Sequence, residues 1–370
     1  MTGSIVDRLA DVAGQFIPQG LVADIREFGR GNINRTFLVT PEAAGESPFI
    51  LQRLNTQVFR QPELVMRNMA VVAGHVSQRL ARTPLPEGRR WEVVRVLLTR
   101  EGHDLLVDAT GSCWRAISFI AAARSLETIT VPAQASEVGW ALGTFHSLLS
   151  DLPPEQLADP LPGFHITPLY LQHYDEVLAS HGAGESPEVK YCLRFVEARR
   201  TGAHVLEQAR ARGRLPLRPI HGDPKVNNIM MDAVSGLAVG MVDLDTIKPG
   251  LVHYDLGDCL RSACNPLGED PEDWEAVRFE TDLGRAILQG YLGAAGGFLA
   301  DEERAYLYDA VRLIAFELGL RFLTDFLEGN VYFNTRDFGQ NLRRALVQFR
   351  LVESIESQAT AIRSMVNELP

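Results

Sequence analysis

The spacing of apolar residues changes near residue 120, and this change restricts the chain to folds that join a sheet to a set of helices. Before this point, β-branched and aromatic runs separated by glycine turns predict antiparallel strands within residues 22–40, 48–55, 91–99 and 103–120. Apolar residues at helical intervals predict two helices in the same part, within residues 3–16 and 61–81. Beyond it, helical spacing prevails, most clearly in residues 132–152, 187–213 and 303–329.

The length of the chain and this change in periodicity together predict two packed units. A chain of 370 residues exceeds the roughly 150 residues of an ordinary domain. We therefore expect an α+β fold with a small, antiparallel, β-rich N-terminal lobe over residues 1–120. A large and mainly helical C-terminal lobe is expected over residues 121–370, with a hinge near residues 119–123.

Charge and composition exclude several classes of partner. The net charge is −11 and the 36 basic residues form no dense run, so we expect no nucleic-acid partner. No apolar run approaches the roughly 18 residues that a membrane span needs, so we expect no membrane partner. The 4 cysteines form no C-x-x-C pair, and the N-terminal residues lack the features of a signal peptide. A cytoplasmic, reduced protein is the resulting expectation, and the oligomeric state stays open.

The helical half of the sequence is interrupted by polar residues and two short apolar runs over residues 217–246. The runs at residues 229–232 and 237–245 are separated by a glycine turn, which predicts a β-hairpin that presents polar residues at its ends. We expect the chemistry of the protein at these ends.

The octapeptide that precedes this hairpin, residues 221–228, has the form H-x-D-x-K-x-x-N. Phosphoryl transfer needs an aspartate that accepts the proton of the acceptor hydroxyl, and an asparagine five residues later is able to bind Mg²⁺. Asp223 and Asn228 have that spacing, and Lys225 is placed to reach the γ-phosphate of a nucleotide. We interpret His221 as a structural histidine that bonds a backbone carbonyl.

A second candidate metal ligand follows the hairpin. Mg²⁺ prefers hard oxygen ligands and bridges nucleotide phosphates, so a carboxylate beside Asn228 is a suitable partner. We choose Asp243, at the end of the second predicted strand, over Asp245. Asp245 is equally suited to facing the acceptor, ordering the loop or binding a second ion. Further along, Asp255 and Asp258 are expected to cap or brace the catalytic loop.

With these motifs, the sequence resembles the aminoglycoside phosphotransferase and choline kinase-like superfamily over nearly its whole length. Within that superfamily it is most similar to the N-acetylhexosamine 1-kinases, which use ATP to phosphorylate the anomeric hydroxyl of N-acetylglucosamine or N-acetylgalactosamine. The closer resemblance is carried by GRGNIN at 29–34, ILQRLN at 50–55, VDLDT at 242–246 and RFLTDFLEG at 321–329.

The resemblance implies a two-lobed, protein-kinase-like fold, ATP and Mg²⁺ as cofactors, and a small sugar as the acceptor. It implies that Asp223 is the catalytic base and that Asn228 and Asp243 hold the metal, in agreement with the assignment from spacing. The residues that it assigns to acceptor binding are Asn32, Asn34, Asp223, Arg321 and Tyr332. The candidates for nucleotide contact are Gly29, Gly31 and Gln52.

Two of these assignments have structural alternatives. The G-x-G at Gly29 and Gly31 is equally typical of a tight turn between strands. Arg321 stands in an apolar helical stretch, where its alternative role is an ion pair with Glu317 or Asp325, one turn away.

The sequence departs from the family pattern at two positions. A kinase-like fold usually has a phosphate-gripping lysine on its third strand, but Gln52 occupies that position and the first 189 residues contain no lysine. This leaves Gln52, Arg53 or Arg30 as its replacement, and the hexosamine kinases share the glutamine. The other departure is Gly222, where those kinases usually carry asparagine.

Two other functions remain alternatives. One is a kinase of another small hydroxyl compound, such as another sugar, choline, an amino alcohol or an aminoglycoside, for which a cationic acceptor would call for clustered carboxylates or aromatic rings. The other is a nucleotide-binding pseudokinase, favoured by the missing lysine and opposed by the intact Asp223, Asn228 and Asp243.

Overall fold

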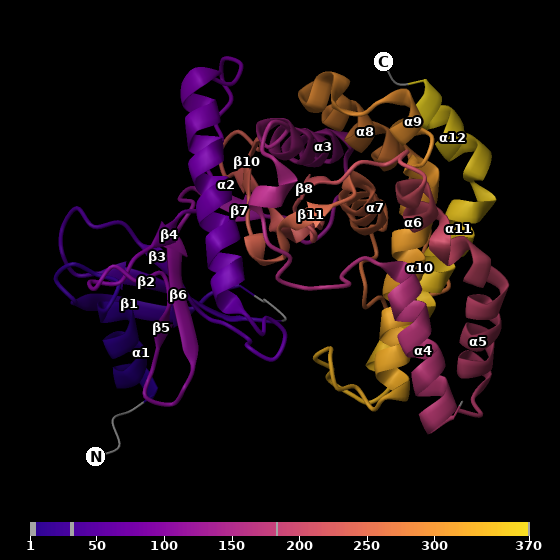
Figure 1. The fold of residues 1–370 in the computed structure, drawn as a ribbon, viewed down its shortest axis with the longest axis horizontal. Coiled ribbons are helices and arrows are strands. Elements are labelled where there is room, and N and C mark those ends of the chain that lie inside the picture. Colours follow the sequence, from indigo (N-terminus) through magenta and orange to yellow (C-terminus); the bar gives the residue numbers. More distant parts are fainter. Residues whose placement is uncertain (1–4, 30–32, 183, 369–370) are drawn as a thin grey trace.

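The β-branched and aromatic runs of the N-terminal part form an antiparallel sheet in the order β1-β2-β3-β6-β4, with β5 paired to β6. The computed structural model describes residues 5–29, 33–182 and 184–368. Its N-terminal strands are β1 (Val22–Glu27), β2 (Arg35–Pro41), β3 (Phe49–Arg53), β4 (Val96–Leu97), β5 (Leu106–Val107) and β6 (Cys113–Ser118). Figure 1 shows this sheet at one end of the molecule and the helical lobe at the other. The expected two-lobed α+β fold is confirmed.

Two of the expected strands differ from the prediction. Residues 22–40 form two strands, β1 and β2, rather than one, because the chain reverses in the loop that contains Gly29, whose φ is 75°. Only Val96 and Leu97 of the expected strand at 91–99 join the sheet. The chain before them turns to the other lobe, where the Glu92 backbone N–H donates to the Val239 carbonyl.

The two faces of the sheet pack against different partners because successive residues of a strand point to opposite sides. On the outer face, helix α1 (Ile5–Gly14) covers Phe37 of β2 and Trp114 of β6. On the inner face, Leu38 of β2 joins the main core, which includes Met69 of helix α2 (Pro62–Arg82). Figure 1 shows α2 standing between the sheet and the helical lobe.

The C-terminal lobe is mainly helical, as expected. Its helices are α3 (Pro132–Leu148), α4 (Thr167–His181), α5 (Pro187–Arg199), α6 (Val205–Ala211), α7 (Val252–Ala263), α8 (Thr281–Ala295), α9 (Asp301–Arg304), α10 (Leu307–Leu327), α11 (Gln340–Ser357) and α12 (Ala359–Asn367). Within residues 187–213, a 3₁₀ turn at Arg200–His204 separates α5 from α6. No helix among the described residues is long and apolar enough to cross a membrane.

Short strands interrupt the helices at the polar motif. The predicted hairpin is confirmed as β9 (Ile229–Asp232) and β10 (Ala238–Met241), which pair in antiparallel register, and β7 (Ala123–Ser125) adds to β9. Strands β8 (Arg218–Ile220) and β11 (Lys248–Gly250) form a second pair. The motif loop joins β8 to β9, and the segment with both candidate acidic residues joins β10 to β11, so the two lie side by side.

Candidate active site

The loop between β8 and β9 brings Asp223, Lys225 and Asn228 into direct contact. The Lys225 ammonium lies 2.6 Å from Asp223 Oδ2. The Asn228 amide nitrogen donates to the Asp223 carbonyl at 2.8 Å and to Asp223 Oδ2 at 3.1 Å. Burial alone would lower the pKa of Lys225, but the carboxylates of Asp223 and Asp243 outweigh it and raise this pKa above its usual range. The motif is therefore assembled as one charged cluster, with Lys225 protonated.

The backbone of this loop is held by a buried carboxylate of α7. Asp255 accepts the backbone N–H groups of His221 at 2.7 Å and Gly222 at 2.8 Å, and His146 of α3 contacts it at 2.9 Å. His221 Nδ1 accepts the Asp223 N–H, so Nε2 carries the proton and donates to the Val242 carbonyl. The structural role predicted for His221 and the brace predicted for Asp255 are thus confirmed.

The same prediction is wrong for Asp258. Its carboxylate pairs with Arg261 of the same helix, at 2.8 Å, and no hydrogen bond joins it to the motif loop among the described residues. The reason is helical geometry, since residues three apart on α7 face each other and Arg261 is the nearer cation.

Gly222 occupies a position where a side chain does not fit. Its φ is +84°, and a Cβ atom would lie 2.7 Å from the Thr246 carbonyl oxygen. Its own carbonyl accepts a 2.7 Å hydrogen bond from His165, whose other ring nitrogen lies 2.9 Å from Glu317. Thr167 also donates to Glu317, at 2.7 Å. The departure from the family at residue 222 thus reflects close packing of the loop against the neighbouring segment.

Asp243 follows β10 and lies close enough to the motif loop for its charge to act on Lys225 and Asp223. Its backbone is left-handed, with φ 63° and ψ 53°. The Asp243 side chain is exposed, but desolvation by neighbouring groups and the nearby carboxylates of Asp245 and Asp223 raise its pKa to about 7. A cation would relieve this crowding of negative charge, and the oxygen of the Asn228 amide is available because only its nitrogen is used within the described chain. Carboxylate and amide oxygens fit Mg²⁺.

Asp245 is committed to a contact between the two lobes. It forms an ion pair with Arg115 of β6, and both side chains are almost wholly buried, at 2% and 1% exposed. Asn34 donates to the other oxygen of Asp245 at 2.7 Å, and Asn34 Oδ1 accepts the Asn55 N–H at 2.9 Å. Of the roles left open for Asp245, the structure supports ordering of the loop. Asn34 was expected in the acceptor pocket, but its amide nitrogen and its amide oxygen both form hydrogen bonds within the protein.

At the position of the usual lysine, Gln52 contacts Arg115, a cation that the sequence analysis did not select. Gln52 Oε1 accepts two hydrogen bonds from Arg115, at 2.9 and 2.7 Å, and Gln52 Nε2 donates to Thr36 at 3.1 Å. Arg53 points to the opposite face of the sheet, so its candidacy as the replacement is wrong. Arg115 supplies a cation on the inner face of the sheet, and the sequence signal for it is a charged residue within the apolar run CWRAIS.

Arg321 of α10 is held by aromatic rings rather than by carboxylates. Its guanidinium carbon lies 5.0 to 5.8 Å from the ring centroids of Phe164, Tyr170, Tyr332 and Phe333. It makes no hydrogen bond or ion pair with the described residues. The alternative of an ion pair with Glu317 or Asp325 is therefore wrong, because those carboxylates have other partners.

Those partners are all internal to the C-terminal lobe. Glu317 is bonded by His165 and Thr167, as described above. Asp325 accepts the backbone N–H groups of Tyr332 at 2.7 Å and Phe333 at 3.0 Å, and the Asn341 amide at 2.8 Å. Asp325 thereby fixes the segment that carries Tyr332 beside Arg321.

The remaining predicted residues lie in the loop between β1 and β2. Gly29 is exposed, and its positive φ fits the tight-turn alternative. Gly31 and Asn32, predicted for nucleotide and acceptor contact, lie outside the described residues, as does Arg30.

A sequence model of the phosphotransferase enzyme family, known by the abbreviation APH, matches residues 24–314. The chain belongs to this family of phosphotransferase enzymes.

Solved structures share its fold at low identity. A choline kinase from Cryptosporidium parvum is 12% identical, with a TM-score of 0.61 and 98% of each chain covered. An aminoglycoside phosphotransferase from Alicyclobacillus acidocaldarius is 13% identical, with a TM-score of 0.60 and 93% of each chain covered. The GDP complex of aminoglycoside 2'-phosphotransferase-IIIa is 14% identical, with a TM-score of 0.56, and the match covers 94% of this chain and 99% of that one.

Proposed function

We propose that the protein is an ATP-dependent sugar kinase that phosphorylates the anomeric hydroxyl of N-acetylglucosamine or N-acetylgalactosamine. The observation that carries the choice of acceptor is the Arg321 guanidinium, which lies among aromatic rings and has no hydrogen bond or ion pair within the described ranges. Burial alone would lower its pKa, but neighbouring groups, Tyr170, Tyr332, Glu317 and Asp223, raise it, so the guanidinium stays charged and lies within reach of the charge of Asp223.

A fixed cation disfavours acceptors that are themselves cations. Choline and the aminoglycosides are positively charged, but the two carboxylates that act on Arg321 are engaged: Glu317 accepts hydrogen bonds from His165 and Thr167, and Asp223 pairs with Lys225. A neutral sugar instead offers hydroxyls and an amide carbonyl, which accept hydrogen bonds from a guanidinium. The half-exposed ring of Tyr332 supplies a flat apolar surface for a pyranose.

The cluster around Asp223 supports the transfer step. Asp223 orients the acceptor hydroxyl and takes its proton, while the oxygen forms a bond to the γ-phosphorus and the bond to ADP breaks. Lys225 lies beside Asp223 and stabilises negative charge on the transferring group. Asn228 and Asp243 would hold Mg²⁺, which neutralises the nucleotide phosphates when bound. Nucleotide use is further supported by the relative solved with GDP.

The test is ADP release from Mg-ATP with N-acetylglucosamine, N-acetylgalactosamine, glucose, galactose, choline and an aminoglycoside, with phosphorus NMR of any product. We expect turnover with an N-acetylhexosamine and a phosphorus signal coupled to the anomeric proton. Turnover of choline or an aminoglycoside alone would overturn the acceptor assignment. Nucleotide binding without turnover on any acceptor would favour the pseudokinase.

A further inference from the structure

A cavity of about 330 Å³ opens on the outer face of the N-terminal sheet, beside α1. Its floor includes the aromatic side chains of Phe37 and Trp114, and Thr110 and Ser112 contribute hydroxyl groups to its wall. It lies on the reverse side of the strands that hold Gln52 and Arg115, because successive residues of a strand face opposite ways. The proposed sugar kinase activity makes no use of it.

Three guanidinium groups line this cavity, in a protein whose net charge is −11. Arg53 forms no hydrogen bond or ion pair with any residue in the described ranges. Arg35 pairs with Glu27 at 2.5 Å, but the two side chains are 60% and 72% exposed. Water or a bound anion therefore replaces Glu27 at the Arg35 guanidinium at little cost in free energy. Arg8 lies 3.9 Å from the nearest carboxylate oxygen, which belongs to Asp108.

Asp108 is the carboxylate that lines the cavity, and the surrounding loop already uses it. It accepts the Thr110 N–H and hydroxyl at 2.8 and 2.6 Å, the Ser112 N–H at 3.1 Å and the Trp114 indole N–H at 2.9 Å. Burial would raise the pKa of Asp108, but these hydrogen bonds hold it below its usual range. The lining thus carries three positive charges against one negative charge.

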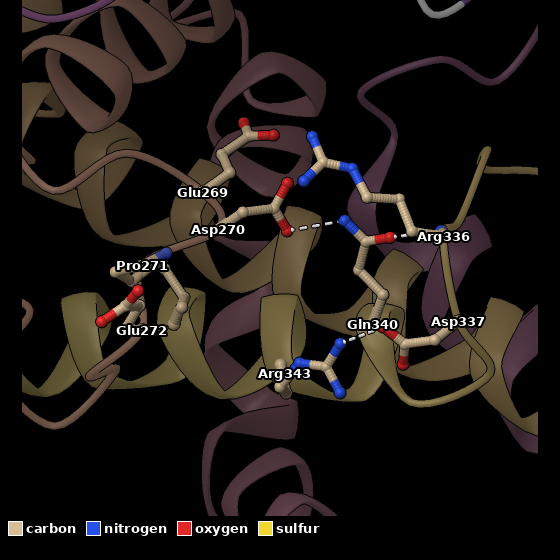
Figure 2. A pocket seen from close by; sticks show the side chains of 9 residues that line it. Glu269, Asp270, Pro271, Glu272, Arg336, Asp337, Gln340 and Arg343 are labelled. Carbon is tan, nitrogen blue, oxygen red and sulfur yellow. Dashed lines mark hydrogen bonds and ion pairs between the residues drawn. The ribbon is translucent and has the colours of Figure 1, made fainter.

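A second cavity, of about 210 Å³, has a lining in which negative charge prevails (Figure 2). It lies against the start of α11, where Arg343 pairs with Asp337 at 2.6 Å and Gln340 bonds Asp270 at 3.1 Å. Glu269 and Glu272 add further carboxylates to its lining. Its lining carries four carboxylates against two guanidinium groups, so it offers no excess of positive charge to an anion.

We propose that the outer cavity binds a small organic phosphate, a phosphate monoester carried on a single ring. A phosphate monoester dianion balances the excess of two positive charges, and its oxygens accept the paired N–H groups of several arginines. The aromatic floor of Phe37 and Trp114 accommodates the ring. The volume lies near the lower end of the roughly 300–1,000 Å³ typical of ligand pockets, which favours a ligand of this size over a dinucleotide.

Isothermal titration of the full chain tests this site, with N-acetylglucosamine 1-phosphate, AMP and inorganic phosphate as probes. Three variants locate the binding. Arg53→Met removes a lining guanidinium, Arg26→Met removes an exposed guanidinium of β1 outside the cavity, and Arg321→Met alters the acceptor site. Arg35→Met replaces Arg53→Met if the thermal unfolding midpoint shows that the latter is misfolded.

We expect at least one ester to bind with a Kd that rises roughly 10- to 100-fold in Arg53→Met and is unchanged in Arg26→Met, whereas binding of the sugar ester at the acceptor site weakens in Arg321→Met instead. The tighter ester distinguishes a sugar phosphate from a nucleotide as the natural source. No binding at millimolar concentration, equal binding by Arg53→Met, or binding that only Arg321→Met weakens would overturn the site. Inorganic phosphate that binds as tightly as both esters would overturn the role of the ring.

Discussion

Arg115 of the N-terminal sheet and Asp245 of the loop after β10 form a buried ion pair, although they stand 130 residues apart in the chain. Gln52 accepts from the same guanidinium and Asn34 donates to the same carboxylate. This network joins the two lobes immediately beside Asp243. Gln52, which stands where this fold usually has a phosphate-gripping lysine, is thus part of the contact between the two lobes.

Loss of Arg115 is expected to destabilise the protein strongly. Arg115→Met leaves the Asp245 carboxylate buried without its cation, which costs about 3–5 kcal/mol of unfolding free energy. The double variant Arg115→Met/Asp245→Asn removes both charges and should lose less than the sum of the two single variants. Chemical denaturation of the four proteins measures this coupling. Strictly additive losses would show that the pair makes no specific contribution.

Asp223→Asn is expected to lower kcat roughly 10²- to 10⁴-fold, because the amide cannot take the proton of the acceptor hydroxyl. Nucleotide affinity should stay close to that of the wild type, since Asn228 and Asp243 remain. ADP release at saturating substrates and titration with Mg-ADP measure the two quantities. Asp24→Asn, on exposed β1, is the matched control. A near-normal kcat in Asp223→Asn contradicts the assignment of the base.

Arg321→Met is expected to weaken acceptor use while preserving nucleotide binding. Loss of a hydrogen bond from a charged donor costs about 1.5–3 kcal/mol, or roughly 10- to 150-fold in kcat/KM for the sugar. Removal of the cation should also reduce the discrimination against choline. The control is Arg194→Met on α5, an exposed arginine without a hydrogen bond or ion pair in the described chain. Unchanged kcat/KM for every acceptor would exclude Arg321 from the acceptor site.

The contacts of His165 predict a stability that depends on pH. Its two ring nitrogens face two acceptors, the Glu317 carboxylate and the Gly222 carbonyl, so the charged imidazolium satisfies both. Burial would lower its pKa, but the charge of Glu317 and the hydrogen bond to it raise the pKa above the usual value. A raised folded pKa stabilises the protein below about pH 6.5, the unfolded value, and this stability is lost as pH rises through the folded pKa.

The measurement is the difference in unfolding midpoint between the wild type and His165→Gln as a function of pH. We expect the difference to be largest near pH 6 and to shrink towards pH 9, because the neutral imidazole donates to only one of the two acceptors. His173→Gln is the control, since His173 is half exposed and contacts Glu328. A difference that is constant over this range would mean that His165 does not titrate in the folded protein.

The sequence by itself determined the fold class, the superfamily and the cluster around Asp223. Periodicity separates strands from helices because it follows from local geometry. The roles of Asp223, Lys225 and Asn228 depend on spacing within a single loop, so the local sequence was enough to bring them together. The same holds for the hairpin of β9 and β10, whose two strands are neighbours in the chain.

Tertiary structure alone decided which distant groups meet. No local sequence pattern indicates that Arg115 pairs with Asp245, that Asp325 accepts backbone N–H groups, or that Arg321 lies among aromatic rings. Strand register decides on which face of the sheet Arg53 lies. The packing of α1 on one face and α2 on the other fixes this register. These outcomes depend on competition among many polar partners, and only the packed chain shows which partner is nearest.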